Sequence, residues 1–233
     1  MQIAFVLYPG FTALDLIGPY EVLSRWPGAE IHFVATTTEP VPTDQGLRML
    51  PTDSPQSLPR PDVVVIPGAE DPLPVLEDEA LIAWVRSAGE TATWCASACT
   101  GAALYARAGL LTGRRATTHW AFREGLRAMG ADVVADRVVF DEKFVTGAGV
   151  SAGIDMALSL TARVHGEELA KALQLAIEYD PQPPFDSGSP DKASASTLRL
   201  ALRALLGDAP LRTVGAHARH TVASLARRAR ASA

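Results

Sequence analysis

The chain has 233 residues, of which 48% are hydrophobic, enough for one large core within the size range that α/β proteins fill as a single domain. The formal net charge is −5, whereas nucleic acid and anionic membranes bind clustered Lys and Arg. Residues 1–6 lack a basic signal-peptide start, and no apolar run approaches the roughly 18 residues of a membrane span. We therefore expect a cytoplasmic protein with no nucleic-acid partner and no membrane partner.

Short β-branched runs alternate with longer amphipathic stretches in the first half of the chain. This alternation predicts an α/β fold with a mostly parallel sheet covered by helices. The apolar run Val63–Ile66 is followed by Pro67-Gly68, which is typical of a strand buried on both faces near the centre of a sheet. In chain order, we expect strands at 3–7, 31–37, 63–66 and 91–96, and helices at 14–23, 75–90 and 100–111.

The second half predicts more helices and several short extended segments. Extended segments are expected at 116–119, 133–134, 138–140 and 144–146, and helices at 120–129, at 153–179 with an interruption near residue 165, at 193–206 and at 214–230. Residues 181–190 are proline-rich and predict an extended linker. We expect a catalytic domain over residues 1–180, followed over residues 181–233 by the linker and a helical extension packed on this domain or on a dimer partner.

The two cysteines, Cys95 and Cys99, are too few for a disulfide framework, and no histidines stand at zinc-ligand spacing. We expect no metal site. Cys99 lies at a predicted strand-to-helix turn, which exposes a nucleophile and points the first helix amides toward a substrate. Those amides predict a thiol pKa below the roughly 8.5 of free cysteine. Burial as a small hydrophobe is the ordinary role of a free cysteine, and we assign that role to Cys95.

Asp15 stands between Leu14 and Leu16 at the start of a predicted helix. An acid at this position commonly satisfies the free amides of the first helical turn. In open α/β sheets, however, the loops at the carboxyl ends of the strands line one crevice. Asp15 is therefore expected to face Cys99, with a raised pKa that lets it donate a proton near neutral pH.

His119 is the one histidine that follows a predicted strand and precedes a predicted helix. It is either a base paired with Cys99 or a hydrogen-bonded residue that shapes the pocket. The segment 147–153 is rich in glycine and alanine, so its backbone can approach a ligand closely. It lacks the lysine and the spacing of a phosphate-binding loop.

Six stretches spread over most of the chain carry a family resemblance. They are residues 14–19 (LDLIGP), 65–68 (VIPG), 98–101 (ACTG), 115–120 (RATTHW), 146–155 (TGAGVSAGID) and 178–185 (EYDPQPPF). They resemble the ThiJ/PfpI superfamily and, within it, the bacterial isocyanide (isonitrile) hydratases. The stretch at 178–185 and the helical tail are similar to this branch in particular.

The resemblance implies a flavodoxin-like, class I glutamine-amidotransferase-like sandwich, usually a homodimer, with no metal or organic cofactor. It implies a hydro-lyase that adds water to an isocyanide, R–NC, and gives an N-substituted formamide through a cysteine thioimidate. Cys99 is then the nucleophile, Asp15 the acid that protonates the substrate and later activates water, and Thr100 a residue that positions Asp15 or the substrate. The amide of Val150 is expected to contact the sulfur. The implied substrate-binding residues are Gly68, Ala69, Gly149, Val150 and His119.

The sequence departs from the family pattern at two positions near the site. Ala69 replaces a second glycine that often follows Pro-Gly, which narrows the pocket, and Ala96 stands where a hydroxyl residue is common. Many superfamily members have Glu at the position of Asp15, whereas the hydratases carry the shorter acid.

Two other functions stay open. One is a different cysteine enzyme of the superfamily, an α-oxoaldehyde hydratase or an amidase-like hydrolase, in which His119 acts as a base. The other is a ligand-sensing domain of the AraC type without its DNA-binding part, because those regulators carry a related amino-terminal domain. The about 40 residues after the linker are too few for the paired helix-turn-helix units of such regulators.

Overall fold

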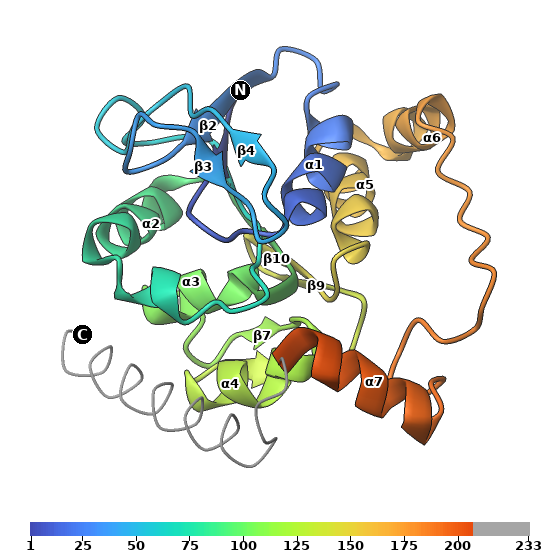
Figure 1. The fold of residues 1–233 in the computed structure, drawn as a ribbon. Coiled ribbons are helices and arrows are strands. Elements are labelled where there is room, and N and C mark those ends of the chain that lie inside the picture. Colours follow the sequence, from blue (N-terminus) through green and yellow to red (C-terminus); the bar gives the residue numbers. More distant parts are fainter. Residues whose placement is uncertain (207–233) are drawn as a thin grey trace.

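The computed structural model describes residues 1–206 (Figure 1). Its centre is a six-stranded sheet of order β2-β1-β5-β6-β10-β9, parallel except for the edge strand β9. The fold is therefore α/β with a mostly parallel sheet, as the sequence predicts. The strands are β1 (Gln2–Val6), β2 (Glu30–Val34), β5 (Val63–Ile66), β6 (Trp94–Ala98), β9 (Val138–Asp141) and β10 (Phe144–Gly147).

Helices cover both faces of this sheet (Figure 1). On one side α1 (Ala13–Leu23) packs against α5 (Ala152–His165), and α5 packs against α6 (Glu167–Ala176). On the other side α2 (Glu79–Thr91) packs against α3 (Ala102–Arg107). All four residues of β5 are fully buried, which explains its uninterrupted β-branched sequence.

The remaining elements are short. Two small sheets pair β3 (Val41–Pro42) with β4 (Arg48–Met49) and β7 (Arg115–Ala116) with β8 (Asp132–Val133). The other helical segments are η1 (Pro74–Glu77), η2 (Cys99–Gly101), η3 (Trp120–Phe122), α4 (Arg123–Ala128) and α7 (Ala195–Leu206). The segment expected to be extended at 116–119 contributes to a small sheet through Ala116 and does not join the central one.

Three predicted helices are wrong in extent. The helix expected at 75–90 is divided at Asp78, whose carboxylate accepts a hydrogen bond of 3.0 Å from the amide of Leu81 and caps α2. The helices expected at 100–111 and 120–129 each begin as a 3-10 turn, η2 and η3. The strand expected at 91–96 is also shifted, because α2 continues to Thr91 and β6 begins at Trp94.

The C-terminal half agrees better with the prediction. The interruption expected near residue 165 is Gly166, whose φ of 92° separates α5 from α6. The helix expected at 193–206 is α7, and the helix expected at 214–230 lies outside the described residues. Among residues 1–206 no helix is both long and apolar enough to cross a membrane.

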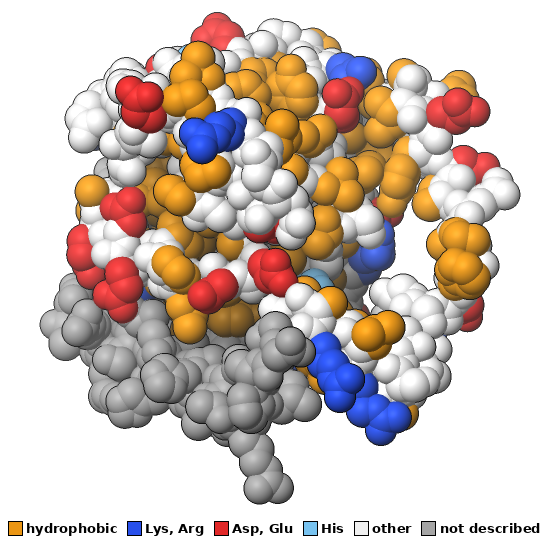
Figure 2. All heavy atoms as spheres, in the orientation of Figure 1, with side chains coloured by type: hydrophobic (Ala, Val, Ile, Leu, Met, Phe, Trp, Pro, Cys, Tyr) orange, Lys and Arg blue, Asp and Glu red, His pale blue; other side chains and the backbone are white. Residues whose placement is uncertain are grey.

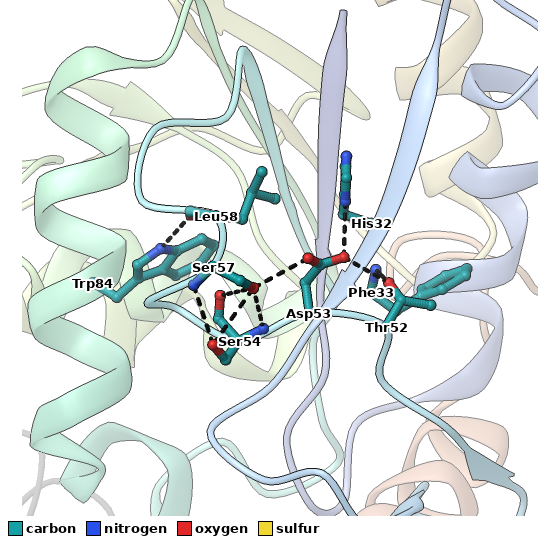
Figure 3. Close-up of polar contacts among 8 residues, drawn as sticks. All are labelled: His32, Phe33, Thr52, Asp53, Ser54, Ser57, Leu58 and Trp84. Atoms are coloured by element: carbon teal, nitrogen blue, oxygen red, sulfur yellow. Dashed lines mark hydrogen bonds and ion pairs between the residues drawn. The ribbon is translucent and has the colours of Figure 1, made fainter.

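A polar cluster around Asp53 ties β2 to the segment that follows β4 (Figure 3). The Nδ1 atom of His32 lies 2.8 Å from Asp53 Oδ2, and the same carboxyl accepts hydrogen bonds from Thr52 and Ser57. The hydrogen bond with His32 lowers the pKa of Asp53. These hydrogen bonds connect the edge strand β2 to residues 52–57.

Candidate active site

Cys99 occupies a sharp turn between β6 and α3. Its φ is 54°, a left-handed conformation that is uncommon for a residue other than glycine and is characteristic of strained functional turns. The hydroxyl of Thr118 donates a hydrogen bond of 2.8 Å to the carbonyl oxygen of Cys99, and the amide of His119 donates a longer one of 3.4 Å. The turn is thus held from the neighbouring segment. This contact is not predictable from the sequence, where the place of Thr118 in the Thr-Thr-His-Trp run is the one related signal.

Two glycines let the loop after β5 approach this turn. A Cβ atom on Gly68 would lie 2.4 Å from the amide nitrogen of Thr100 and 2.9 Å from Asp15 Oδ2. A Cβ atom on Gly101 would lie 2.3 Å from the carbonyl oxygen of Ile66. Since real Cβ atoms do not come this close to backbone, both positions require glycine.

Asp15 lies in the first turn of α1 and is completely buried. Its Oδ2 atom accepts a hydrogen bond of 2.9 Å from the amide of Gly68, and its Oδ1 atom has no hydrogen-bond partner among residues 1–206. Burial raises the pKa of this carboxyl to about 7, against opposing contributions from the Gly68 amide and the Cys99 thiol. The predicted raised pKa is confirmed.

Thr100 connects the turn at Cys99 to the loop that holds Asp15. Its hydroxyl accepts a hydrogen bond of 2.8 Å from the amide of Ala69 and donates one of 2.8 Å to the carbonyl oxygen of the same residue. Ala69 follows Gly68, which binds Asp15. The side chain of Thr100 thereby fixes the loop and, through it, the carboxyl.

The pKa expected for Cys99 is wrong in direction. Burial raises the pKa of the Cys99 thiol well above its usual value, and the Asp15 carboxylate adds to the rise, whereas the amide of Thr100 lowers it. Cys99 as a whole residue is 5% exposed, so loss of hydration outweighs the helix amides. The helix that follows is short, since η2 has three residues and α3 has six.

The Cys99 thiol and the Asp15 carboxyl titrate as a coupled pair. The carboxyl has a pKa of about 7 and the thiol has a raised pKa. The two groups together therefore hold one proton over a wide range above neutral pH. Asp15 can accept the thiol proton as the sulfur attacks, so the nucleophile need not be a thiolate beforehand.

Cys95 takes the role that the sequence predicts. It is fully buried within β6, and its thiol donates to the carbonyl oxygen of Gly89 at 3.6 Å. Burial raises its pKa to about 11. It is a core residue.

Tyr8 is a residue near the site that sequence reasoning did not identify. Its hydroxyl donates a hydrogen bond of 2.6 Å to the carbonyl oxygen of Pro67. Burial raises its pKa, and the charges of Asp15 and Cys99 add to this rise. Tyr8 therefore stays neutral and supports the loop that carries Gly68.

A cavity of about 1020 Å³ opens above Cys99. Of the residues expected at the site, Ala69, Cys99, Thr100, His119 and Val150 line it. Asp15 and Gly68 are joined by a hydrogen bond next to this lining, and Gly149 lies beside His119, where a Cβ atom would be 3.8 Å from the ring. The lining also includes Leu14, Leu47, Leu73, Phe122 and Leu205. The lining is largely apolar, although it also includes the acidic residues Asp44, Glu70 and Asp71, and it suits a substrate with a large apolar part.

The ring of His119 faces its own turn. Its Nδ1 atom accepts a hydrogen bond of 3.4 Å from the amide of Ala121, and no hydrogen bond between this ring and the Cys99 sulfur is found within residues 1–206. Burial lowers the pKa of His119, and the positive charge of Arg123 lowers it further. The ring is therefore neutral at physiological pH.

The segment 147–153 forms the turn into α5. The amide of Ala152 donates to the carbonyl of Gly149 at 3.0 Å, and the amide of Gly153 donates to Val150 at 3.4 Å. The expected contact between the Val150 amide and the sulfur stays a prediction. No group of three or more potential metal ligands occurs in the described part of the chain.

Fold and site together define an α/β protein with a cysteine on a strained turn, and the chain belongs to the DJ-1/PfpI family, whose sequence profile matches residues 1–163. It is 42% identical to the isonitrile hydratase of Pseudomonas putida over 91% of this chain and 93% of that protein. It is similar to the crystal structure of a ThiJ/PfpI family protein from Pseudomonas syringae, with a TM-score of 0.87 and 36% identity over 97% of this chain and 90% of that one.

A more distant similarity connects the chain to transcriptional regulators. It is 29% identical to the HTH-type transcriptional regulator CdhR of Pseudomonas aeruginosa over 71% of this chain, but this spans 51% of the regulator. The similarity to the isonitrile hydratase extends over nearly the whole of both chains.

Proposed function

We propose that this protein is an isocyanide hydratase, a hydro-lyase that converts R–NC and water into R–NH–CHO. The observation that carries the proposal is the pairing of Cys99 with the buried carboxyl of Asp15 beside one largely apolar cavity. An isocyanide has an apolar R group and one reactive carbon, so it fits such a site. The 42% identity to an isonitrile hydratase over 91% of the chain supports the same conclusion.

The first step forms a bond between sulfur and the terminal carbon of the isocyanide. Asp15 takes the thiol proton as the Cys99 sulfur attacks, and then delivers this proton to the same carbon, which carries the developing lone pair. The product is the thioimidate R–N=CH–S–Cys99, and Asp15 returns to its carboxylate form.

The second step adds water to the thioimidate. Asp15 removes a proton from water while the oxygen bonds to the thioimidate carbon, and the nitrogen then takes that proton. The C–S bond breaks as the C=O bond forms, and the hydroxyl proton returns to the sulfur. The sum is R–NC + H₂O → R–NH–CHO, without oxidation or reduction.

Thr100 and His119 have different roles in this proposal. Thr100 positions Asp15 through the Ala69 loop, and His119 is a neutral wall residue.

We further propose the homodimer that the family resemblance implies, which size-exclusion chromatography with light scattering would test.

The direct test is turnover of an aryl isocyanide, with production of the N-aryl formamide followed by chromatography. We expect turnover by the wild-type protein and a loss of about 10³-fold or more in Cys99→Ala. The matched control is Cys95→Ala, which removes a buried thiol from the strand that leads to Cys99 and should keep the rate. Turnover that survives the loss of Cys99 would refute the mechanism, and no turnover of any isocyanide would refute the function.

A further inference from the structure

The chain after α6 forms an arm, residues 177–206, that ends at the cavity. Residues 180–188 are exposed, and the arm crosses from α6 to α7 along the outside of the molecule (Figure 1). Residues Ala204 and Leu205 of α7 nevertheless line the cavity above Cys99. The arm thus brings a distant part of the chain to the candidate site.

The arm starts from an anchored residue. The hydroxyl of Tyr179 donates a hydrogen bond of 3.0 Å to Asp155 Oδ2, and the guanidinium of Arg137 contacts the same oxygen at 2.7 Å. The main chain of Tyr179 is also bonded to Gln174. Tyr179 and Asp155 belong to two of the stretches that carry the family resemblance, and their contact fixes where the arm leaves the body.

One face of α7 is less exposed than the other. Leu198, Ala201, Leu202 and Leu205 are all half-buried, at the spacing of a single helical stripe. Leu200 points away and is 69% exposed. Leu205, the last member of this stripe in α7, lines the cavity together with Ala204.

The charges on α7 and on the cavity lining favour the placement of α7 beside the cavity. The cavity lining includes the acidic residues Asp44, Glu70 and Asp71, and α7 carries Arg199 and Arg203. Figure 2 shows Lys and Arg side chains over α7 and acidic side chains on the neighbouring body. Opposite charges on the two surfaces attract across this boundary.

We propose that α7 is the outer wall of the substrate cavity and that Leu205 contacts the R group of the isocyanide. This proposal rests on the proposed function for the identity of the substrate. In the proposed mechanism Cys99 and Asp15 act on the isocyanide carbon and nitrogen and on water, so selection among R groups falls to the cavity walls. An apolar leucine at the outer end of the cavity favours isocyanides with a bulky apolar R group over small ones.

The test compares two isocyanides in two variants of the full chain. Leu205→Ala should lower the ratio of kcat/KM for cyclohexyl isocyanide to that for methyl isocyanide by about tenfold, since several methyl and methylene contacts are lost only for the larger substrate. Leu200→Ala, on the exposed side of the same helix, should leave this ratio unchanged. A ratio in Leu205→Ala that is unchanged or increased would overturn the proposal.

A second measurement does not depend on turnover. The rate of Cys99 alkylation by N-cyclohexylmaleimide, relative to iodoacetamide, is followed by peptide mass spectrometry. Leu205→Trp should lower this relative rate roughly threefold or more, because access governs thiol modification, whereas Leu200→Trp should not. If no isocyanide is turned over but the two Trp variants still differ in relative alkylation rate, the proposed function is refuted and the assignment of α7 as the cavity wall stands. If Leu205→Trp behaves like Leu200→Trp, the wall is refuted whatever the substrate.

Discussion

The amide of Gly68 donates a hydrogen bond of 2.9 Å to Asp15 Oδ2 across 53 residues of sequence. This bond occupies one carboxyl oxygen, whereas Oδ1 has no hydrogen-bond partner in residues 1–206. Oδ1 is therefore the atom that we propose for proton transfer. A buried carboxyl with one fixed and one unengaged oxygen is suited to accept a proton and return it in a defined direction.

Activity should rise with pH through the pKa of Asp15. Below about pH 7 both Asp15 and Cys99 are protonated, and the carboxyl cannot accept the thiol proton; above it the pair holds one proton and can react. We expect kcat/KM to increase about tenfold per pH unit below pH 7 and then to level off. Asp15→Asn should lose this dependence along with most of the activity. A flat profile in the wild-type protein would contradict the role of Asp15.

The same pKa predicts an opposite dependence for stability. The pKa of Asp15 is raised from 3.8 to about 7 on folding, so the folded state binds more protons than the unfolded state between these values. The free energy of unfolding then falls as pH rises across this window. Relative to Asp15→Asn, the wild-type protein should lose about 3 kcal/mol between about pH 5 and about pH 8.

Denaturant unfolding of both proteins at each pH measures this difference. The substitution is nearly isosteric, and the asparagine oxygen can still accept from Gly68. A difference in unfolding free energy that stays constant with pH would show that the carboxyl is not perturbed.

Gly68→Ala should damage the site more than it damages the fold. The new methyl would collide with the Thr100 amide and hydroxyl and with Asp15 Oδ2, at 2.4, 2.7 and 2.9 Å. We expect a loss of about 10²-fold in kcat, since small displacements of reacting groups have effects of this size, and a destabilisation of about 1–3 kcal/mol. Gly188→Ala, where an added Cβ meets nothing within 4 Å, is the matched control and should change neither quantity.

His119→Ala separates the proposed hydratase from an enzyme that needs a histidine base. The ring is neutral and bonded to its own turn, so its removal should lower kcat/KM by about tenfold or less through altered packing of the cavity wall. Steady-state kinetics on the same aryl isocyanide gives the answer. Abolition of activity comparable to that in Cys99→Ala would favour a cysteine–histidine mechanism instead.

The sequence was most informative where one physical demand dominates. The strand Val63–Ile66 has the predicted bounds because full burial requires an unbroken apolar run. The prediction of one continuous helix over 75–90 is wrong because apolar periodicity continues across Asp78, whose capping hydrogen bond depends on a single side chain. Helical spacing alone does not distinguish an α-helix from a 3-10 turn followed by one.

At the site, local signals point to Asp15 and Cys99, and the family resemblance adds Thr100, but neither predicts the supporting contacts of Thr118 and Tyr8. Thr118 and Tyr8 act through bonds to the carbonyls of Cys99 and Pro67, and such long-range contacts follow from the folded backbone. The predicted direction of the shift in the Cys99 pKa is wrong for a related reason. Helix amides can be inferred from a turn in the sequence, whereas the depth of burial cannot.

The left-handed backbone of Cys99, with φ at 54°, places chemistry and folding in competition at one position. Glycine adopts this conformation freely, so Cys99→Gly should relieve strain of about 1 kcal/mol and yield a more stable protein without turnover. Stability and the proposed chemistry therefore favour different residues at position 99. Variants selected for stability alone are expected to lose the thiol on which the proposed mechanism depends.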